Sequence, residues 1–353
     1  MKKKFDYSFL KKEYIPANIV NYIAFIERER GLTVNTESNY PKAFKELERQ
    51  AKINSIKGSN AIEGIYTSDE RIRSISTGQT VPLSHSEQEI SGYRDALNLI
   101  HENYIDIPIN EETIKFLHAT MLAPSMSEQA GDYKKDDNIV SEERSDGSRT
   151  VVFTPPTAAE TSELMEQLLL AYKEANQDPA INKLLLIPCF ILDFLCIHPF
   201  LDGNGRISRL LTLLLFYKNG YSAGKYISFE EKINKDKNTY YEALRKCSEF
   251  WYEDSPEFFP FIEYTLKKLS ECYADITSRF DAIGSSKLKK SERIKYAILN
   301  STIPKSKKNL IEELPDISPT TIEAELTKLQ KEDLIIKIGK GRSTKYISKR
   351  NIQ

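Results

Sequence analysis

The chain has 353 residues, a length that corresponds to about two domains. Apolar residues make up 40% and charged residues 29%, a balance that is typical of soluble globular proteins and excludes an acidic disordered chain. With 50 Lys and Arg against 51 Asp and Glu, the net charge of −1 excludes a uniformly basic nucleic-acid coat protein. The four cysteines form no CxxC pair, which favours reduced thiols in a cytoplasmic protein.

The N-terminus and the most apolar segment are both atypical of secreted or membrane proteins. The chain starts with MKKKFDYSFLKKEY, which is positively charged but lacks the apolar run of a signal peptide. Residues 184–197 read LLLIPCFILDFLCI, and this run of 14 residues contains Pro188 and Asp193. Because a membrane span requires about 20 apolar residues, we expect a buried core helix here and no membrane association.

Apolar residues recur at helical spacing through most of the chain, which predicts a mainly α fold. In chain order, helices are expected at residues 40–55, 87–101, 111–122, 161–176, 184–197 and 207–217. A strand is expected at residues 150–154 (TVVFT), which are rich in β-branched side chains and precede Pro155-Pro156. The polar stretch 134–149 before it contains the turn dipeptide Asp146-Gly147. We therefore predict a β-hairpin flap on a helical bundle.

The charge balance changes near residue 284, where Gly284-Ser285-Ser286 predicts a linker. From Lys287 to Gln353 there are 16 Lys and Arg against 8 Asp and Glu, a net charge of +8. Residues 1–286 carry a net charge of −9. The near-neutral total therefore combines a basic tail domain with an acidic body.

The tail combines three short helices with two short strands. Helices are expected at residues 291–300 and 306–314, and a third from Pro319 to about residue 333 with Ser318 as its N-cap. Strands at 334–338 and 345–347 follow, joined by residues 339–342 (GKGR). This order resembles a winged helix-turn-helix domain, a small α+β fold. Since the third helix begins with Thr320 and Thr321 rather than base-reading side chains, we favour weak DNA contact or protein contact over sequence-specific repression.

The densest group of chemically capable residues lies at 198–209, HPFLDGNGRISR. Gly203 and Gly205 flank Asn204 directly before an amphipathic helix, so backbone N–H groups and the helix N-terminus can bind an anion together. Arg206 and Arg209 lie three residues apart and share one face of that helix. Two guanidinium groups beside such a nest indicate a polyphosphate ligand.

Two further residues of this segment complete a candidate catalytic group. Asp202 offers a hard carboxylate oxygen beside the anion site, which suits Mg²⁺, and His198 precedes the nest as a candidate general base. Taken singly, a histidine before proline is usually structural and a DGNG segment is usually a turn. The chain has no GxxxxGK[ST] P-loop, and none of its four histidines pair at the spacing of a zinc site.

HPFLDGNGRISR resembles the signature of the Fic/Doc family, HPFx[D/E]GN[G/K]RxxR, and matches it at every fixed position. Proteins of this family are helical enzymes that mostly transfer AMP from ATP to hydroxyl side chains of proteins. The resemblance covers roughly residues 87–269. It implies a Fic catalytic core at 87–283, preceded by an N-terminal helical region at 1–86 and followed by the winged-helix domain at 287–353.

The resemblance also implies a role for each residue of the motif. His198 takes the proton from a Ser, Thr or Tyr hydroxyl of the target protein, and Asp202 holds Mg²⁺ (or Mn²⁺) at the α and β phosphates. The reaction is an in-line attack on the α-phosphorus with pyrophosphate as the leaving group. The ATP-binding residues are implied to be Gly203, Asn204, Gly205, Arg206 and Arg209, the last of which receives the γ-phosphate.

Two more segments fit the family pattern. The hairpin upstream of the motif is implied to dock a target segment by strand addition through Val151, Val152 and Phe153; the alternative is an ordinary edge hairpin. The segment NTYYEAL at 238–244 resembles the family's YYxxL segment near the adenine, which makes Tyr240 a candidate for stacking on the base. The alternative for Tyr240 is core packing.

An upstream segment, SNAIEG at 59–64, resembles the family's inhibitory motif [S/T]xxxE[G/N]. Ser59 and Glu63 lie four residues apart on one helix face, and Gly64 is a natural helix stop. The resemblance implies an N-terminal inhibitory helix in which Glu63 forms a salt bridge to Arg209 and so occupies the partner of the γ-phosphate. Ser59 is implied to hydrogen-bond near the nest and hold this helix.

Several alternatives stay open from the sequence alone. The same fold could remove AMP from a target, transfer phosphate, UMP or phosphocholine, or sense nucleotide as a transcriptional regulator. An intact His198 favours an enzyme over a sensor. The target protein, the signal that releases Glu63, and the choice between monomer and homodimer are not encoded in any pattern we identify.

Overall fold

The structure of the chain is a computed structural model. It describes residues 4–12, 14–143, 149–253, 257–284, 289–299, 301, 304–339 and 341–349. Three predicted features fall wholly or partly outside these residues: the turn Asp146-Gly147, the linker residues Ser285-Ser286, and Lys340 in the wing.

The chain divides into two compact units. The first comprises residues 1–28 and 51–272, and the second comprises residues 29–50 and 273–353. All three boundaries between the units fall inside long helices, because α1 (Ala17–Asn39), α2 (Pro41–Ile62) and α12 (Phe259–Gly284) each contribute residues to both units. The predicted domain boundaries at residues 87 and 287 remain predictions.

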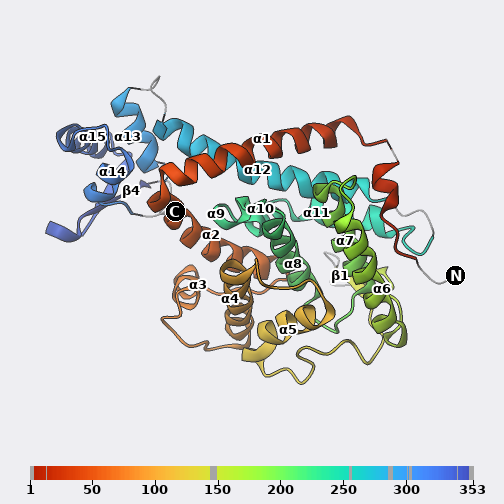
Figure 1. Cartoon of the computed structure of the whole chain (residues 1–353). Coiled ribbons are helices and arrows are strands. Elements are labelled where there is room, and N and C mark those ends of the chain that lie inside the picture. The colour runs from red at the N-terminus through yellow and green to blue at the C-terminus, as the bar shows by residue number, and fades with distance from the viewer. Residues whose placement is uncertain are drawn as a thin grey trace. The chain divides into compact units, whose positions relative to one another are not determined.

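The first unit is a bundle of helices around α8, as Figure 1 shows. Helix α8 (Asn204–Lys218) is buried on all sides from Arg206 to Tyr217, and it packs against α4, α5 and α7. The other elements of this unit, with their bounds, are the 3₁₀ turns Ser8–Lys11 and Ala123–Ser125 and the helices α3 (Asp69–Ser76), α4 (His85–Asn103), α5 (Glu111–Leu122), α6 (Ala158–Gln177), α7 (Lys183–Ile197), α9 (Ala223–Tyr226), α10 (Phe229–Lys235) and α11 (Lys237–Ser248).

Local sequence explains where these helices begin. The side chains of Ser84, Asn110 and Asn182 each accept a backbone hydrogen bond at the start of α4, α5 and α7, respectively. Helix α6 begins with a capping box between Thr157 and Glu160. The prediction of a mainly α fold is therefore confirmed, and residues 184–197 form the buried core helix α7 as expected. In the described part of the chain, no helix is long and apolar enough to cross a membrane.

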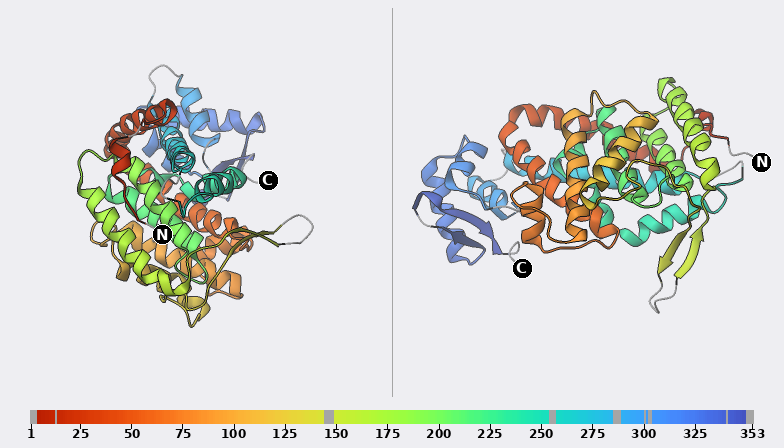
Figure 2. Two further views of the ribbon diagram at one scale, coloured as in Figure 1. Left: turned by 90° about the vertical axis from the view of Figure 1, so that its right-hand side faces the viewer. Right: turned by 90° about the horizontal axis from the view of Figure 1, so that it is seen from below.

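The predicted hairpin is present as two antiparallel strands, β1 (Val140–Glu143) and β2 (Arg149–Phe153). It projects from the helical body of the first unit in both views of Figure 2. Phe153 at the base of β2 contacts Trp251 and stacks on Tyr252, whose hydroxyl donates a hydrogen bond of 2.7 Å to the Thr154 carbonyl. One end of the hairpin is thereby fixed to the helical body.

The second unit contains the three predicted short helices and the second hairpin. The helices are α13 (Lys290–Leu299), α14 (Lys307–Glu313) and α15 (Pro319–Lys331), with Ser318 as the N-cap of α15. Strands β3 (Ile335–Ile338) and β4 (Lys345–Ser348) pair antiparallel around the 3₁₀ turn Gly341–Ser343. Arg293 of α13 makes a two-pronged ion pair with Asp316 at 2.6 and 2.9 Å, which ties α13 to the turn before α15. The winged helix-turn-helix interpretation stays a prediction.

Candidate functional site

The turn between α7 and α8 is built from two residues in the left-handed conformation. His198 ends α7 with φ 50° and ψ 59°, and Gly203 begins α8 with φ 80° and ψ 0°. A side chain at position 203 would be strained at this φ, which explains the glycine. The Asn204 amide closes the turn, because its oxygen accepts from the Phe200 N–H at 3.0 Å and its nitrogen donates to the Phe200 carbonyl at 2.7 Å. The backbone N–H groups at the start of α8 are thereby held in place.

The His198 imidazole is held as a proton acceptor. Its Nδ1 donates to the Leu195 carbonyl at 3.2 Å, since a carbonyl oxygen can only accept, and this leaves Nε2 with a free electron pair. Burial of the ring lowers the pKa of His198 to about 4, and the nearby Lys134 charge contributes in the same direction. The ring is therefore neutral at pH 7 and able to take up a proton.

Lys134 and Asn138 hold the backbone around His198, and the sequence reasoning missed both. The Lys134 ammonium donates to the Ile197 carbonyl at 3.2 Å and to the Asn138 side chain at 2.8 Å. Asn138 in turn donates to the Phe200 carbonyl at 3.0 Å. Burial lowers the pKa of Lys134 to about 8. The polar stretch before the hairpin carries no local pattern that distinguishes these two residues from its other charges.

His118 is a second unanticipated residue, on α5. Its Nδ1 accepts from the Gly131 N–H at 2.9 Å, so Nε2 carries the proton and donates to the Asp202 carbonyl at 3.1 Å. The ring stacks on Phe200 with a centroid separation of 3.7 Å. Burial lowers its pKa to about 4. His118 therefore fixes the backbone of Asp202 as a neutral donor.

Mild acid is expected to destabilise the protein through His118 and His198. Because both folded-state pKa values are lowered from 6.5 to about 4, the unfolded chain binds protons more readily, and stability falls as the pH drops from about 6.5 to about 4. Each histidine is expected to cost about 2 kcal/mol at pH 5 relative to neutral pH. Urea unfolding of the wild type and of His118→Gln at pH 7 and pH 5 measures this effect, and the variant should show the shallower pH dependence.

A His118→Gln variant that loses as much stability between pH 7 and pH 5 as the wild type would contradict the assignment.

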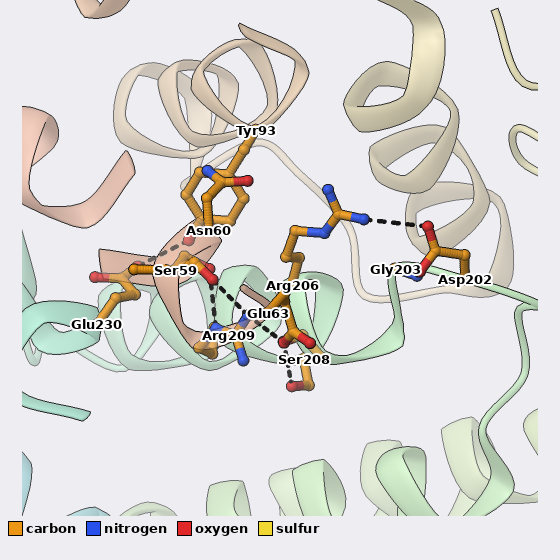
Figure 3. Close-up of polar contacts among 12 residues, drawn as sticks. Ser59, Asn60, Glu63, Tyr93, Asp202, Gly203, Arg206, Ser208, Arg209 and Glu230 are labelled. Atoms are coloured by element: carbon orange, nitrogen blue, oxygen red, sulfur yellow. Dashed lines mark hydrogen bonds and ion pairs between the residues drawn. The ribbon is translucent and has the colours of Figure 1, made fainter. Parts of the chain in front are cut away.

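Asp202 and Arg206 lie against each other at the start of α8 (Figure 3). The Asp202 carboxylate accepts from the Gly203 N–H at 2.6 Å and from the Arg206 guanidinium at 3.3 Å, and its side chain is 75% exposed. Arg206 itself is buried and donates to Glu89 of α4 at 2.7 Å. Its Nε has no hydrogen-bond partner within the described residues. Glu89 was not anticipated from the sequence, because it lies far from the motif in a helix with no functional pattern.

The predicted contact between Glu63 and Arg209 is present. The Arg209 guanidinium donates to the Glu63 carboxylate at 2.7 Å, to the Ser59 hydroxyl at 2.9 Å and to the Ser59 carbonyl at 3.0 Å. Burial is the largest single influence and lowers the pKa of Arg209, but the charge and hydrogen bond of Glu63 together with Tyr240 and Tyr93 outweigh it, so the pKa is raised. Helix α2 ends at Ile62, and Gly64 follows with φ 78°. The Glu63 side chain is one-third exposed, whereas that of Arg209 is fully buried.

Glu63 also lies directly against the predicted anion nest. A Cβ atom added to Gly205 would be 2.3 Å from the Glu63 Oε1 and 3.4 Å from an Arg209 nitrogen. The carboxylate thus occupies space at the N-terminus of α8 where a bound anion would meet Arg209. The geometry brings together His198, Asp202, Arg206, Arg209 and Glu63 at one end of α8.

The remaining predicted site residues lie as follows. Tyr240 on α11 is 4% exposed and packs among Tyr241, Phe261 and Tyr264, and its hydroxyl interacts electrostatically with Ser208 and Arg209. The neighbouring Tyr241 is 40% exposed. In the hairpin, Val151 and Val152 are exposed, and no third strand pairs with β2 in the part of the chain that the structure describes. The roles of these residues in binding ATP and a target segment stay predictions.

The residues present fit a magnesium ion that arrives with a nucleotide. The described residues contain no cluster of three or more His, Cys, Asp or Glu side chains that could hold a metal ion by themselves. Mg²⁺ is commonly bound by one or two carboxylates together with substrate phosphates. The exposed Asp202 carboxylate at the helix N-terminus provides one such ligand.

Comparison with known proteins identifies relatives of this chain. Residues 108–216 match the model of the Fic/DOC family. The chain is 25% identical over 245 residues to the protein adenylyltransferase Fic of Nematostella vectensis, an alignment that covers 67% of this chain and 52% of the relative. It is 27% identical over 95 residues to a Fido domain-containing protein of Dictyostelium discoideum, covering 26% of this chain and 62% of that protein. The chain thus spans between half and two thirds of the length of these relatives.

Solved structures show the same fold. A Fic family protein from Desulfovibrio desulfuricans superposes with a TM-score of 0.63 at 21% identity, covering 95% of this chain and 97% of that one. A Fic domain-containing signaling protein from Bacteroides thetaiotaomicron superposes with a TM-score of 0.58 at 21% identity, covering 73% and 94%. These similarities confirm the predicted Fic-type helical fold.

Proposed function

Residues 108–216 of this chain form a Fic/DOC family domain, and we propose that the protein is an auto-inhibited protein adenylyltransferase. It transfers AMP from ATP to a Ser, Thr or Tyr hydroxyl of a target protein, or of itself, and releases pyrophosphate. The observation that carries the proposal is the turn from α7 to α8, where a neutral His198 and two arginines meet a helix N-terminus. The name of the Nematostella relative supports the same reaction.

His198 acts as the general base in this proposal. Its Nε2 electron pair accepts the proton of the target hydroxyl, while the hydroxyl oxygen forms a bond to the α-phosphorus. The bond between the α-phosphorus and its bridging oxygen breaks, and that oxygen leaves with the pyrophosphate. The bond from Nδ1 to Leu195 keeps the ring in the required tautomer throughout.

The start of α8 and its arginines bind the triphosphate. The backbone N–H groups after Gly203 and the positive end of the helix attract the phosphates. The unpartnered Arg206 Nε offers a buried donor, which a phosphate oxygen would satisfy. When Mg²⁺ is bound, it neutralises phosphate charge beside Asp202. Arg209 is the partner of the γ-phosphate and is held for that purpose by Ser59.

Glu63 is the brake in this proposal. Its carboxylate is paired with Arg209 at 2.7 Å, so it competes directly with the γ-phosphate for the same guanidinium. A carboxylate left at this place also repels the phosphate charge. ATP can therefore adopt its productive position only after Glu63 has turned away. The exposure of Glu63 and its position beyond the last residue of α2 permit this motion without unwinding the helix.

The hairpin is the proposed target-docking element. Val151 and Val152 are exposed on β2, whose base is fixed by Phe153. An extended target segment could add to this edge through main-chain hydrogen bonds and present its hydroxyl with little sequence selection. Residues 287–353 are proposed as a further contact surface for a target protein or, weakly, for DNA.

The position of a label in ATP tests the proposed reaction. The Glu63→Gly variant is incubated with Mg²⁺, a cell lysate and ATP labelled at either the α- or the γ-phosphate. Label that depends on the added variant, measured against lysate alone because lysate kinases use γ-labelled ATP, is expected only from α-labelled ATP. Variant-dependent label from γ-labelled ATP would indicate phosphate transfer. Bound ATP with no protein labelling in any arm would contradict transfer and favour AMP removal or nucleotide sensing.

A further inference from the structure

A buried carboxylate behind Arg209 has no place in the mechanism above. Glu230 lies in the first turn of α10 and is fully buried. The Tyr93 hydroxyl donates to it at 3.0 Å and the Ser228 hydroxyl at 3.3 Å. Burial raises the pKa of Glu230, whereas these hydrogen bonds and the Arg209 charge oppose the rise. Burying an acid is costly unless its partners compensate, so the surroundings of this group call for an explanation.

Glu230 is connected to Arg209 through Tyr93 and Ser59 (Figure 3). The Arg209 Nε donates to the Ser59 hydroxyl at 2.9 Å. The Tyr93 hydroxyl donates to Glu230 at 3.0 Å and interacts electrostatically with Ser59 and Arg209. The side chain that holds Arg209 is thus itself supported by Tyr93 and the buried carboxylate.

Ser59, which contacts Arg209, is held in place by close packing of α2 on α10. A Cβ atom added to Gly58 would be 2.8 Å from the Glu231 backbone nitrogen, so only glycine permits this approach. The Ser55 hydroxyl donates to Ser228 at 3.0 Å, and the Asn54 amide donates to the Glu231 side chain at 3.0 Å. Helix α2 is thus fixed on α10 up to Ser59, whereas Glu63 lies past the end of the helix.

Arg209 therefore faces two acids of different kinds. Glu63 is partly exposed, bonds the guanidinium directly and lies beyond the last helical residue. Glu230 is fully buried and acts through Tyr93 and Ser59, which lie on elements packed against each other. The contacts of Arg209 with Ser59 do not involve Glu63, so they persist when Glu63 turns away.

We propose that Tyr93 and Glu230 are positioning residues that hold Arg209, through Ser59, in the orientation that receives the γ-phosphate of ATP. This inference rests on the proposed function, since it assumes that Arg209 meets that phosphate. Arg209 then has one carboxylate contact that ATP displaces and one indirect support, through Ser59, that stays. The indirect support keeps the guanidinium in place in the released enzyme, so that releasing the brake does not also disorder the ATP site.

The test compares ATP with ADP, because only ATP carries the group that Arg209 receives. Binding of each nucleotide is measured by calorimetry in Glu63→Gly, in Glu63→Gly with Tyr93→Phe, and in Glu63→Gly with Glu230→Gln. Tyr93→Phe removes the hydroxyl link while keeping the ring. We expect it to lower the preference for ATP over ADP by about fivefold or more, with affinity for ADP nearly unchanged. Glu230→Gln keeps an acceptor for Tyr93 and should have a smaller effect in the same direction.

Tyr172→Phe in the Glu63→Gly background is the matched control. Tyr172 is also buried, at 4% exposure against 0% for Tyr93, and its hydroxyl interacts with Asn219 rather than with residues around Arg209. It should leave the ATP-to-ADP ratio unchanged. If Tyr93→Phe does not fold, Glu230→Gln carries the same test alone.

The outcomes separate this inference from the proposed reaction. An unchanged ATP-to-ADP ratio in both the Tyr93 and Glu230 variants would overturn the inference, whatever the absolute affinities. A ratio near one in Glu63→Gly itself would overturn both the γ-phosphate role of Arg209 and the inference. A lowered ratio in a chain that transfers no AMP would support the inference and refute the proposed reaction.

Discussion

Glu63→Gly is expected to raise the rate of AMP transfer by about 10- to 100-fold over the wild type. A hydrogen bond between charged groups contributes about 1.5–3 kcal/mol, and each 1.4 kcal/mol corresponds to a factor of ten. ATP no longer has to displace the carboxylate that lies 2.7 Å from Arg209. Because Glu63 is one-third exposed, water screens part of the interaction, and the lower end of the range is the firmer expectation. Initial rates with α-labelled ATP measure the effect.

A second variant sharpens this prediction. Glu63→Gln keeps the shape of the side chain and removes its charge, so it should give an intermediate rate. Equal rates in the wild type and Glu63→Gly would refute auto-inhibition while leaving the transfer reaction open.

His198→Ala is expected to lower AMP transfer by about 10²- to 10⁴-fold in the Glu63→Gly background, the range associated with loss of a general base. ATP affinity should change little, because the assigned phosphate contacts come from α8 and not from the imidazole. Rates and nucleotide affinity measured on the same variant distinguish loss of the base from loss of binding.

Leu170 on α6, which is 56% exposed, provides the control for truncation to alanine. Leu170→Ala in the same background should transfer AMP at the rate of the parent variant. Loss of ATP binding in His198→Ala would show instead that the turn has lost its structure. An unchanged rate of AMP transfer would show that His198 is not the general base. The Asn204 bonds to Phe200, which do not involve the imidazole, favour a turn that persists.

The sequence predicts those parts of the site that are contiguous in the chain. The prediction at residues 111–122 coincides with α5, since Asn110 caps the helix and acidic residues follow in its first turn. The segment 198–209 folds as one turn and one helix, so spacing along the chain determines where its residues lie. Glu63 could be connected to Arg209 only through the family resemblance, because no local pattern joins residues 146 positions apart.

The residues that were missed share one property. Tyr93, His118 and Glu230 lie on three different helices and Lys134 lies in the loop before β1, so only the tertiary fold brings them to the site. Each of them contacts backbone groups or other side chains rather than a proposed substrate, so its residue type alone indicates no function. Within the predicted N-terminal helical region 1–86, the bounds of α1 were not predicted, since charged residues interrupt its apolar periodicity.

Because Glu63 and Arg209 belong to one polypeptide, the proposed brake is a tethered competitor of ATP. The carboxylate faces the guanidinium at an effective concentration that does not depend on the amount of protein. Diluting the protein does not release Glu63, so ATP has to compete with a carboxylate that stays attached beside Arg209. The ATP level at which the proposed enzyme becomes active is therefore determined by how tightly one side chain holds Arg209, and any ligand or modification that loosens that hold lowers the threshold.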